Sequence, residues 1–128
     1  MILSMLLLSG LQVPDPAPAL DAVKTCDRVE MRKMIAGEPH RRTEFAAAAY
    51  AEQRAIARER ATLLAAPSAD RGEGTPAGEA DTANALGQLD GRQKQLDDAR
   101  AVETSWRALF DEMRADFLAN CNGRKDSQ

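Results

Sequence analysis

Residues 96–121, LDDARAVETSWRALFDEMRADFLANC, decide the fold. Their apolar side chains recur at steps of three and four residues, which is the spacing of one face of an α-helix. The same stripe begins further upstream and comprises Leu86, Leu89, Leu96, Ala99, Val102, Trp106, Phe110, Met113, Phe117 and Cys121. No proline interrupts residues 79–122, so we expect one long helix there.

A second helical stretch precedes it, over residues 20–66. Its apolar stripe is thinner and consists of Leu20, Val23, Cys26, Met31, Met34, Phe45, Ala49, Ile56 and Leu63. The strongest helix breaker in this stretch is Gly37-Glu38-Pro39, because proline lacks an N–H and restricts the residue before it. We therefore expect the first helix to kink or split near Gly37–Pro39.

Residues 67–78, PSADRGEGTPAG, form a loop rich in proline and glycine between the two helical arms. The arms have 47 and 44 residues. At 1.5 Å per residue each arm is about 65 to 70 Å long. Near-equal arms joined by a short loop predict an all-α fold, a long antiparallel two-helix hairpin that is coiled-coil-like. Residues 123–128 are expected to form a polar tail.

Cys26 and Cys121 are the only cysteines, and they lie at nearly equal distances from the centre of the 67–78 loop. A chain that folds back at this loop places them opposite each other near its free ends. In an exported protein such a pair indicates a disulfide, which could stabilise the fold by about 4 to 5 kcal/mol. Two buried thiols and an intermolecular bridge are the alternatives.

The first nineteen residues indicate where the protein is located. Residues 1–13 are an apolar run, followed by prolines and by the small triplet Ala17-Pro18-Ala19. This pattern is typical of a secretory signal peptide, although no basic residue precedes the run. The run is shorter than the about 20 apolar residues of a membrane-spanning helix. We expect residues 1–19 to be a signal peptide and the protein to be periplasmic or secreted; the alternatives are an N-terminal anchor to the inner membrane and a cytosolic chain.

The charge of the 128-residue chain excludes one class of partner. A net charge of -3 does not fit a basic nucleic-acid-binding protein, so we expect no nucleic acid. Residues 20–66 carry nine basic and seven acidic side chains, whereas residues 79–122 carry five basic and nine acidic ones, so the arms should attract each other. Pairs spaced by four residues should support each helix. These pairs are Glu38 with Arg42, Asp90 with Lys94, and Glu103 with Arg107.

Residues that could carry chemistry are few. His40 is the only histidine, and no serine or cysteine lies at a spacing typical of a hydrolase. The alternative is a copper-handling protein that uses Met31, Met34, His40 and Met113, because soft sulfur ligands select copper(I). Methionines on an apolar stripe more often fill a core. We therefore expect no enzyme activity, no cofactor and no metal site.

A two-helix hairpin buries little apolar surface by itself, so part of its stripe should meet a partner. The sequence thus predicts a small exported non-enzymatic protein of the bacterial envelope, a scaffold or a chaperone-like or sensor-like binding module. Its partner is another protein or a second copy in a homodimer, and after signal cleavage no membrane is involved. Retention of residues 1–13 would instead make it a membrane-tethered coiled-coil component.

Overall fold

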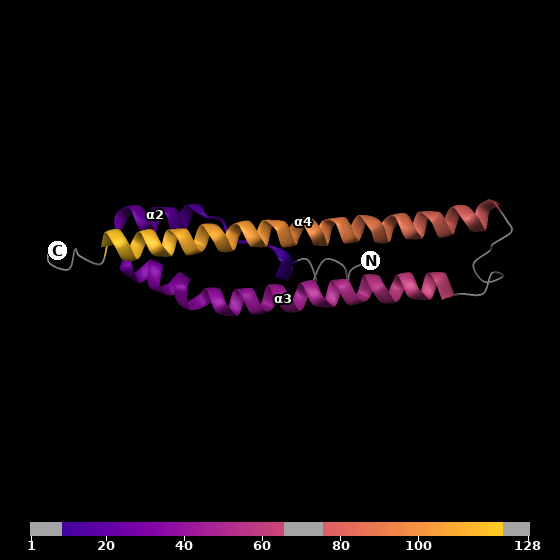
Figure 1. Ribbon diagram of the computed structural model, residues 1–128, viewed down its shortest axis with the longest axis horizontal. Coiled ribbons are helices and arrows are strands. Elements are labelled where there is room, and N and C mark those ends of the chain that lie inside the picture. The colour runs from indigo at the N-terminus through magenta and orange to yellow at the C-terminus, as the bar shows by residue number, and fades with distance from the viewer. Residues whose placement is uncertain (1–8, 66–75, 122–128) are drawn as a thin grey trace.

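The computed structural model describes residues 9–65 and 76–121, and both ranges are helical apart from short connections (Figure 1). The elements are the short 3-10 helix η1 (Ser9–Leu11), α2 (Ala17–Thr25), α3 (Arg28–Ala65) and α4 (Pro76–Cys121). Helices α3 and α4 lie side by side in opposite directions, and α2 packs on both near the end of α4 (Figure 1). The described ranges thus hold three α-helices, where two had been expected.

The first expected arm divides at Cys26. Cys26 has a φ of 53°, a left-handed conformation that ends α2. Asp27 then begins α3, because its Oδ1 accepts a hydrogen bond of 3.1 Å from the Glu30 N–H. The split therefore lies at residues 26–27, and α3 continues without interruption through Pro39.

Helix α4 begins at Pro76, three residues before the expected start, and ends at Cys121. Proline is favourable at the first position of a helix because the N–H that it lacks would have no partner there. Residues 67–75 of the expected loop, the expected tail (123–128) and residues 1–8 of the expected signal peptide lie outside the described residues.

The core consists of two apolar clusters between the helices. Cluster 1 contains Phe45, Ala49, Ile56, Leu89 and Leu96, and cluster 2 contains Ala19, Trp106, Phe110 and Met113. Every α4 member of both clusters belongs to the predicted stripe, which is therefore largely confirmed. Val102 is the exception, because half of its surface is exposed.

Buried positions recur every seven residues along the two long helices. On α4 they include Leu89, Leu96, Glu103 and Phe110, and on α3 they include Glu38 and Phe45. A seven-residue recurrence keeps one face of each helix directed at the other. Two glutamates therefore occupy positions at which an apolar side chain would be expected.

The segment before α2 is part of the packing. Residues 9–16, which we name the N-terminal segment, lie between α3 and α4 (Figure 1). Leu11 packs on cluster 1 and Val13 packs on cluster 2. Gly10 comes so close to α3 that a Cβ added to it would lie 2.9 Å from the Cβ of Ala48. Residues of the expected signal peptide thus contact both clusters.

The predicted disulfide is confirmed. Cys26 and Cys121 are bonded, with 5.4 Å between their Cα atoms, and they join the end of α2 to the end of α4. Arg28 of α3 reinforces this end by donating a hydrogen bond of 2.8 Å to the carbonyl oxygen of Cys121. Within residues 9–65 and 76–121, no helix combines the length and the apolar character that crossing a bilayer requires.

Candidate functional site

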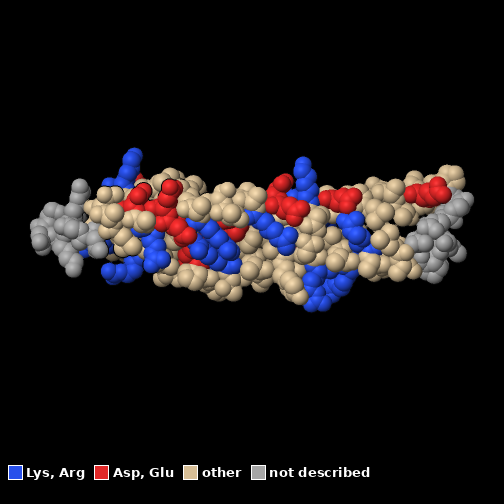
Figure 2. Space-filling model, in the orientation of Figure 1, with Lys and Arg blue, Asp and Glu red and all other residues tan. Residues whose placement is uncertain are grey.

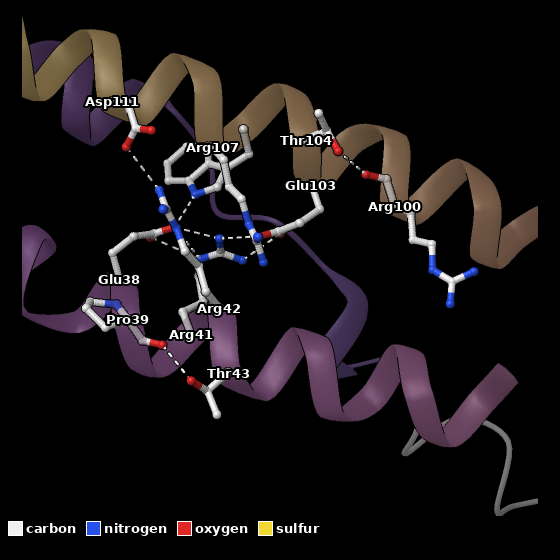
Figure 3. A network of polar contacts seen from close by, with 11 residues as sticks. Glu38, Pro39, Arg41, Arg42, Thr43, Arg100, Glu103, Thr104, Arg107 and Asp111 are labelled. Atoms are coloured by element: carbon white, nitrogen blue, oxygen red, sulfur yellow. Dashed lines mark hydrogen bonds and ion pairs between the residues drawn. The ribbon is translucent and has the colours of Figure 1, made fainter. Parts of the chain in front are cut away.

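A buried group of charges joins α3 to α4 about one third of the way from the disulfide. We name Glu38, Arg41 and Arg42 of α3 and Glu103 and Arg107 of α4 the ionic cluster (Figure 3). The two carboxylates are almost completely buried, with exposed fractions of 6% for Glu38 and 3% for Glu103. Buried carboxylates are rare unless they are paired, so their partners decide what the cluster does.

Arg41 bridges the two carboxylates. Its Nη2 lies 2.6 Å from Oε1 of Glu38 and 2.7 Å from Oε1 of Glu103. Its Nη1 donates to Oε2 of Glu103 at 2.9 Å, and its Nε donates to both oxygens of Glu38. A planar guanidinium suits this double two-point contact, which a lysine could not make.

Other side chains also donate hydrogen bonds to the two carboxylates. Glu38 also accepts hydrogen bonds from Nε1 of Trp106 at 2.8 Å and from Nε of Arg42 at 3.0 Å. Arg107 donates to Oε1 of Glu103 at 2.8 Å, while Arg42 reaches Oδ1 of Asp111 at 3.3 Å. Three arginines thus face three carboxylates, and the charges in this region balance.

The hydrogen bonds also determine the protonation state of the two glutamates. Burial by itself would raise the pKa of Glu38, but the donors Arg41, Trp106 and Arg42 outweigh burial and lower that pKa below its ordinary value. The same competition, with Arg41 and Arg107 as the donors, lowers the pKa of Glu103. The hydrogen bond to Glu103, followed by that to Glu38, raises the pKa of Arg41. All three groups are therefore charged at neutral pH.

This arrangement suits a structural role. A general acid needs a pKa near the working pH, whereas both glutamates here have lowered pKa values. Their oxygens are engaged by arginine and tryptophan donors, so they are directed at the protein and not at a substrate. The ionic cluster therefore fixes how α3 and α4 align.

A second polar layer joins the same helices nearer the other end. Arg92 of α4 donates to Glu52 at 2.8 Å and also contacts Glu59. Gln53 and Gln93 exchange hydrogen bonds of 2.8 and 3.0 Å through their side-chain amides. Acidic and basic side chains also lie beside one another on the surface where the helices meet (Figure 2). Attraction between the arms, as their charges predicted, is thus seen in contacts between the helices.

A pocket of about 320 Å³ lies beside the ionic cluster. Its lining includes Pro14 of the N-terminal segment, Pro18 of α2, Met34 of α3, and Trp106 and Phe110 of α4. The pocket is near the lower end of the size range of small-molecule sites. It exists because the N-terminal segment and the start of α2 cover the aromatic side chains of α4.

The methionine and histidine candidates lie in different surroundings. Met34 packs against cluster 2, to which Met113 belongs, and both Met31 and Met113 are buried. His40 lies on an exposed face of α3, where its Nε2 is 3.1 Å from Oε1 of Glu44. Among the described residues, no three His, Cys, Asp or Glu side chains are grouped as a metal site requires.

Sequence reasoning found only the outer contacts of the ionic cluster. The four-residue spacing correctly paired Glu38 with Arg42 and Glu103 with Arg107. It missed Arg41, whose position opposite Glu103 follows only from the alignment of the two helices. It also paired Asp90 with Lys94, whereas the carboxylate of Asp90 accepts a hydrogen bond from Arg60 of α3.

No protein-family model, no curated protein and no solved structure matches this chain.

Proposed function

We propose that the protein is a small exported, non-enzymatic helical hairpin that acts through contacts with other proteins, as a scaffold or binding module. One observation carries the proposal. Among the described residues, α2 and η1 lie along only part of the α3–α4 pair (Figure 1). We name the half of the α3–α4 pair away from the disulfide the distal half. Its residues 56–65 and 76–89 remain a two-helix layer, where Leu63 and Leu86 are only half-buried.

Two helices alone enclose a narrow core, and most helical domains add a third or fourth helix to cover it. In the half near the disulfide, α2 supplies that third helix. A helix of a partner protein, or of a second copy of this chain, would supply it for the distal half. Binding of a helix in an apolar groove is a common mode of protein recognition.

The disulfide supports export. Cys26 and Cys121 are 95 residues apart in sequence, and a bond that closes such a long loop persists in an oxidising compartment such as the periplasm. Intact mass of the protein isolated from its host, before and after reduction with alkylation, tests this point. Loss of about nineteen residues together with two thiols that react only after reduction supports export. A full-length mass with both thiols free contradicts it.

We further interpret the α3–α4 pair as an antiparallel coiled coil with a kink at Pro39. The seven-residue recurrence of buried positions supports this interpretation. The two polar layers then lie at positions that are usually apolar, where charged groups select one alignment of the helices over others.

Site-specific photo-crosslinking in the host cell tests the proposed contact. A benzophenone amino acid is placed at Leu86 in the distal half and, as a matched control, at the exposed Glu112 in the other half of the same helix. We expect a discrete crosslinked species from position 86 and a much weaker one from position 112. Equal yields at both positions, together with a monomeric mass in solution, would contradict a partner at the distal half.

A further inference from the structure

We propose that residues 9–19 act as a removable plug, and that their loss on export opens a docking face for an extended apolar segment of a partner protein. The docking face consists of Phe45, Ala48 and Ala49 of α3 and Trp106 and Phe110 of α4. This inference rests on the export proposed above. It concerns a second face, separate from the distal half, and it names the chemistry of the segment that binds there and the event that makes the face available.

The plug fits its place closely at Gly10. A Cβ at this position would lie 2.9 Å from the Cβ of Ala48 and 3.8 Å from the backbone oxygen of Glu44. Carbon atoms in van der Waals contact are about 3.5 to 4.0 Å apart, so the position accepts a glycine and excludes larger residues. The contact therefore selects a particular sequence.

The next residues alternate between the face and solvent. Leu11 and Val13 are half-buried against clusters 1 and 2, whereas Gln12 between them is exposed. An alternation with a period of two is that of an extended chain with one apolar side. Pro14 follows and lines the pocket with Trp106 and Phe110. The motif that this face accepts is thus a small residue, two apolar residues separated by one polar residue, and a proline.

The expected cleavage site separates the plug from the groups that hold α3 and α4 together. Cleavage after Ala19 removes Leu11, Val13 and the fully buried Ala19 itself. Cys26 lies beyond the cut, so the disulfide to Cys121 stays, and the contacts of Arg41 within the ionic cluster do not involve residues 9–19. The aromatic side chains under the plug would then be uncovered, and exposed apolar patches of this kind usually mark interaction sites.

The test uses the full chain with its disulfide formed. The double variant Leu11→Asp with Val13→Asp displaces the plug, because each change places a charge against an apolar cluster. The probe is a fluorescent peptide with the sequence of residues 9–19, SGLQVPDPAPA, followed by anisotropy. We expect the displaced variant to bind the peptide at least ten times more tightly than the unmodified chain, whose own plug competes at a high effective concentration.

A matched pair of changes shows whether binding uses the proposed face. A peptide with Gly10→Ala should bind the displaced variant at least ten times more weakly, because its methyl group meets Ala48. Adding Ala48→Gly to the displaced variant should restore binding of this peptide, whereas Ala47→Gly on the exposed side of α3 should not.

The docking face would be overturned by no binding by a folded displaced variant, by equal binding of both peptides, or by loss of helical circular dichroism in the displaced variant. The last result counts because a face that needs its plug in order to stay folded cannot receive a partner. Self-association of the displaced variant that the peptide does not compete with would also overturn it. Retention of residues 9–19 in chain isolated from the host would overturn only the export and the removal of the plug.

Discussion

Removing the Arg41 guanidinium tests the ionic cluster most directly. In Arg41→Leu, Glu103 keeps one donor, Arg107, and Glu38 keeps its two other donors. In the present packing both glutamates are more than nine-tenths buried. Removing one partner of a buried ion pair typically costs about 3 to 5 kcal/mol. Because other donors remain, we expect the free energy of unfolding to fall by about 3 kcal/mol.

Urea unfolding followed by circular dichroism at neutral pH, with the disulfide intact, measures this change. Arg58→Leu is the matched control, because Arg58 is an exposed arginine on the same helix. It should change the free energy of unfolding by less than about 0.5 kcal/mol. Arg41→Lys keeps the charge but loses the two-point contacts. Its loss in free energy of unfolding should therefore lie between those of Arg41→Leu and Arg58→Leu.

Equal losses in Arg41→Leu and Arg58→Leu would refute the reasoning. A further variant separates loss of a charge from loss of packing. Replacing all three groups, by Glu38→Met, Arg41→Leu and Glu103→Met, removes both carboxylates together with the guanidinium that they share, and it leaves the Trp106 N–H without its acceptor. It should recover only part of the stability that Arg41→Leu loses, because no buried carboxylate is left without a partner, whereas the buried Trp106 N–H costs about 1 to 3 kcal/mol when it has no acceptor.

Other predictions follow from the same contacts. Because the pKa values of Glu38 and Glu103 are lowered by folding, the unfolded chain binds more protons in acid. The free energy of unfolding, measured in urea at several pH values, should therefore be constant above about pH 4.3 and fall as the pH drops through the lower folded pKa values. Cys26→Ser with Cys121→Ser should lower the same quantity by up to about 4 to 5 kcal/mol and make it insensitive to reductant, whereas reductant should destabilise the unmodified chain. Asp27→Ala should cost about 1 kcal/mol through loss of the helix cap, and an unchanged urea midpoint would contradict that assignment.

Helix α4 and the disulfide could be predicted from the sequence. The helix depends on the spacing of its own apolar residues, and the disulfide depends on the equal distances of the two cysteines from the loop. The apolar stripe from Leu89 to Met113 has a helical period that no proline disturbs, and the structure buries most of it. The cysteine pairing followed from their distances to the loop, and it needed no knowledge of side-chain contacts. Both the period of an apolar stripe and the loop at which a chain folds back can be recognised in a single sequence.

The division of the first arm could have been found but was not. Asp27 followed by Glu30 three residues later is a typical start of a helix, and the structure uses Asp27 as the cap of α3. The break was expected at Pro39 instead, because an internal proline usually costs a helix about 3 kcal/mol, but α3 is continuous through this residue. Here Glu38, Arg41 and Arg42, on both sides of Pro39, bond to each other and to α4, which offsets that cost.

The burial of Glu38 and Glu103 could not be predicted, because it depends on the exact neighbour that each helix presents to the other. A shift of one helical turn, about 5.4 Å, would separate Arg41 from Glu103. Local spacing places both glutamates next to arginines on their own helices, and that is equally compatible with a solvated surface. Only the aligned pair of helices shows that one guanidinium serves both carboxylates.

This dependence on alignment explains what the ionic cluster contributes. Buried positions recur every seven residues on both long helices, so α3 could slide along α4 by seven residues, about 10 Å, while the apolar faces still matched in part. After such a slide Glu38 and Glu103 would no longer share Arg41, and the pairing of Gln53 with Gln93 would also break. Leaving a buried carboxylate without its partner costs about 3 to 5 kcal/mol, so the shifted alignments are disfavoured. We infer that the polar layers contribute mainly by excluding the shifted alignments, and that the disulfide then holds the one alignment that remains.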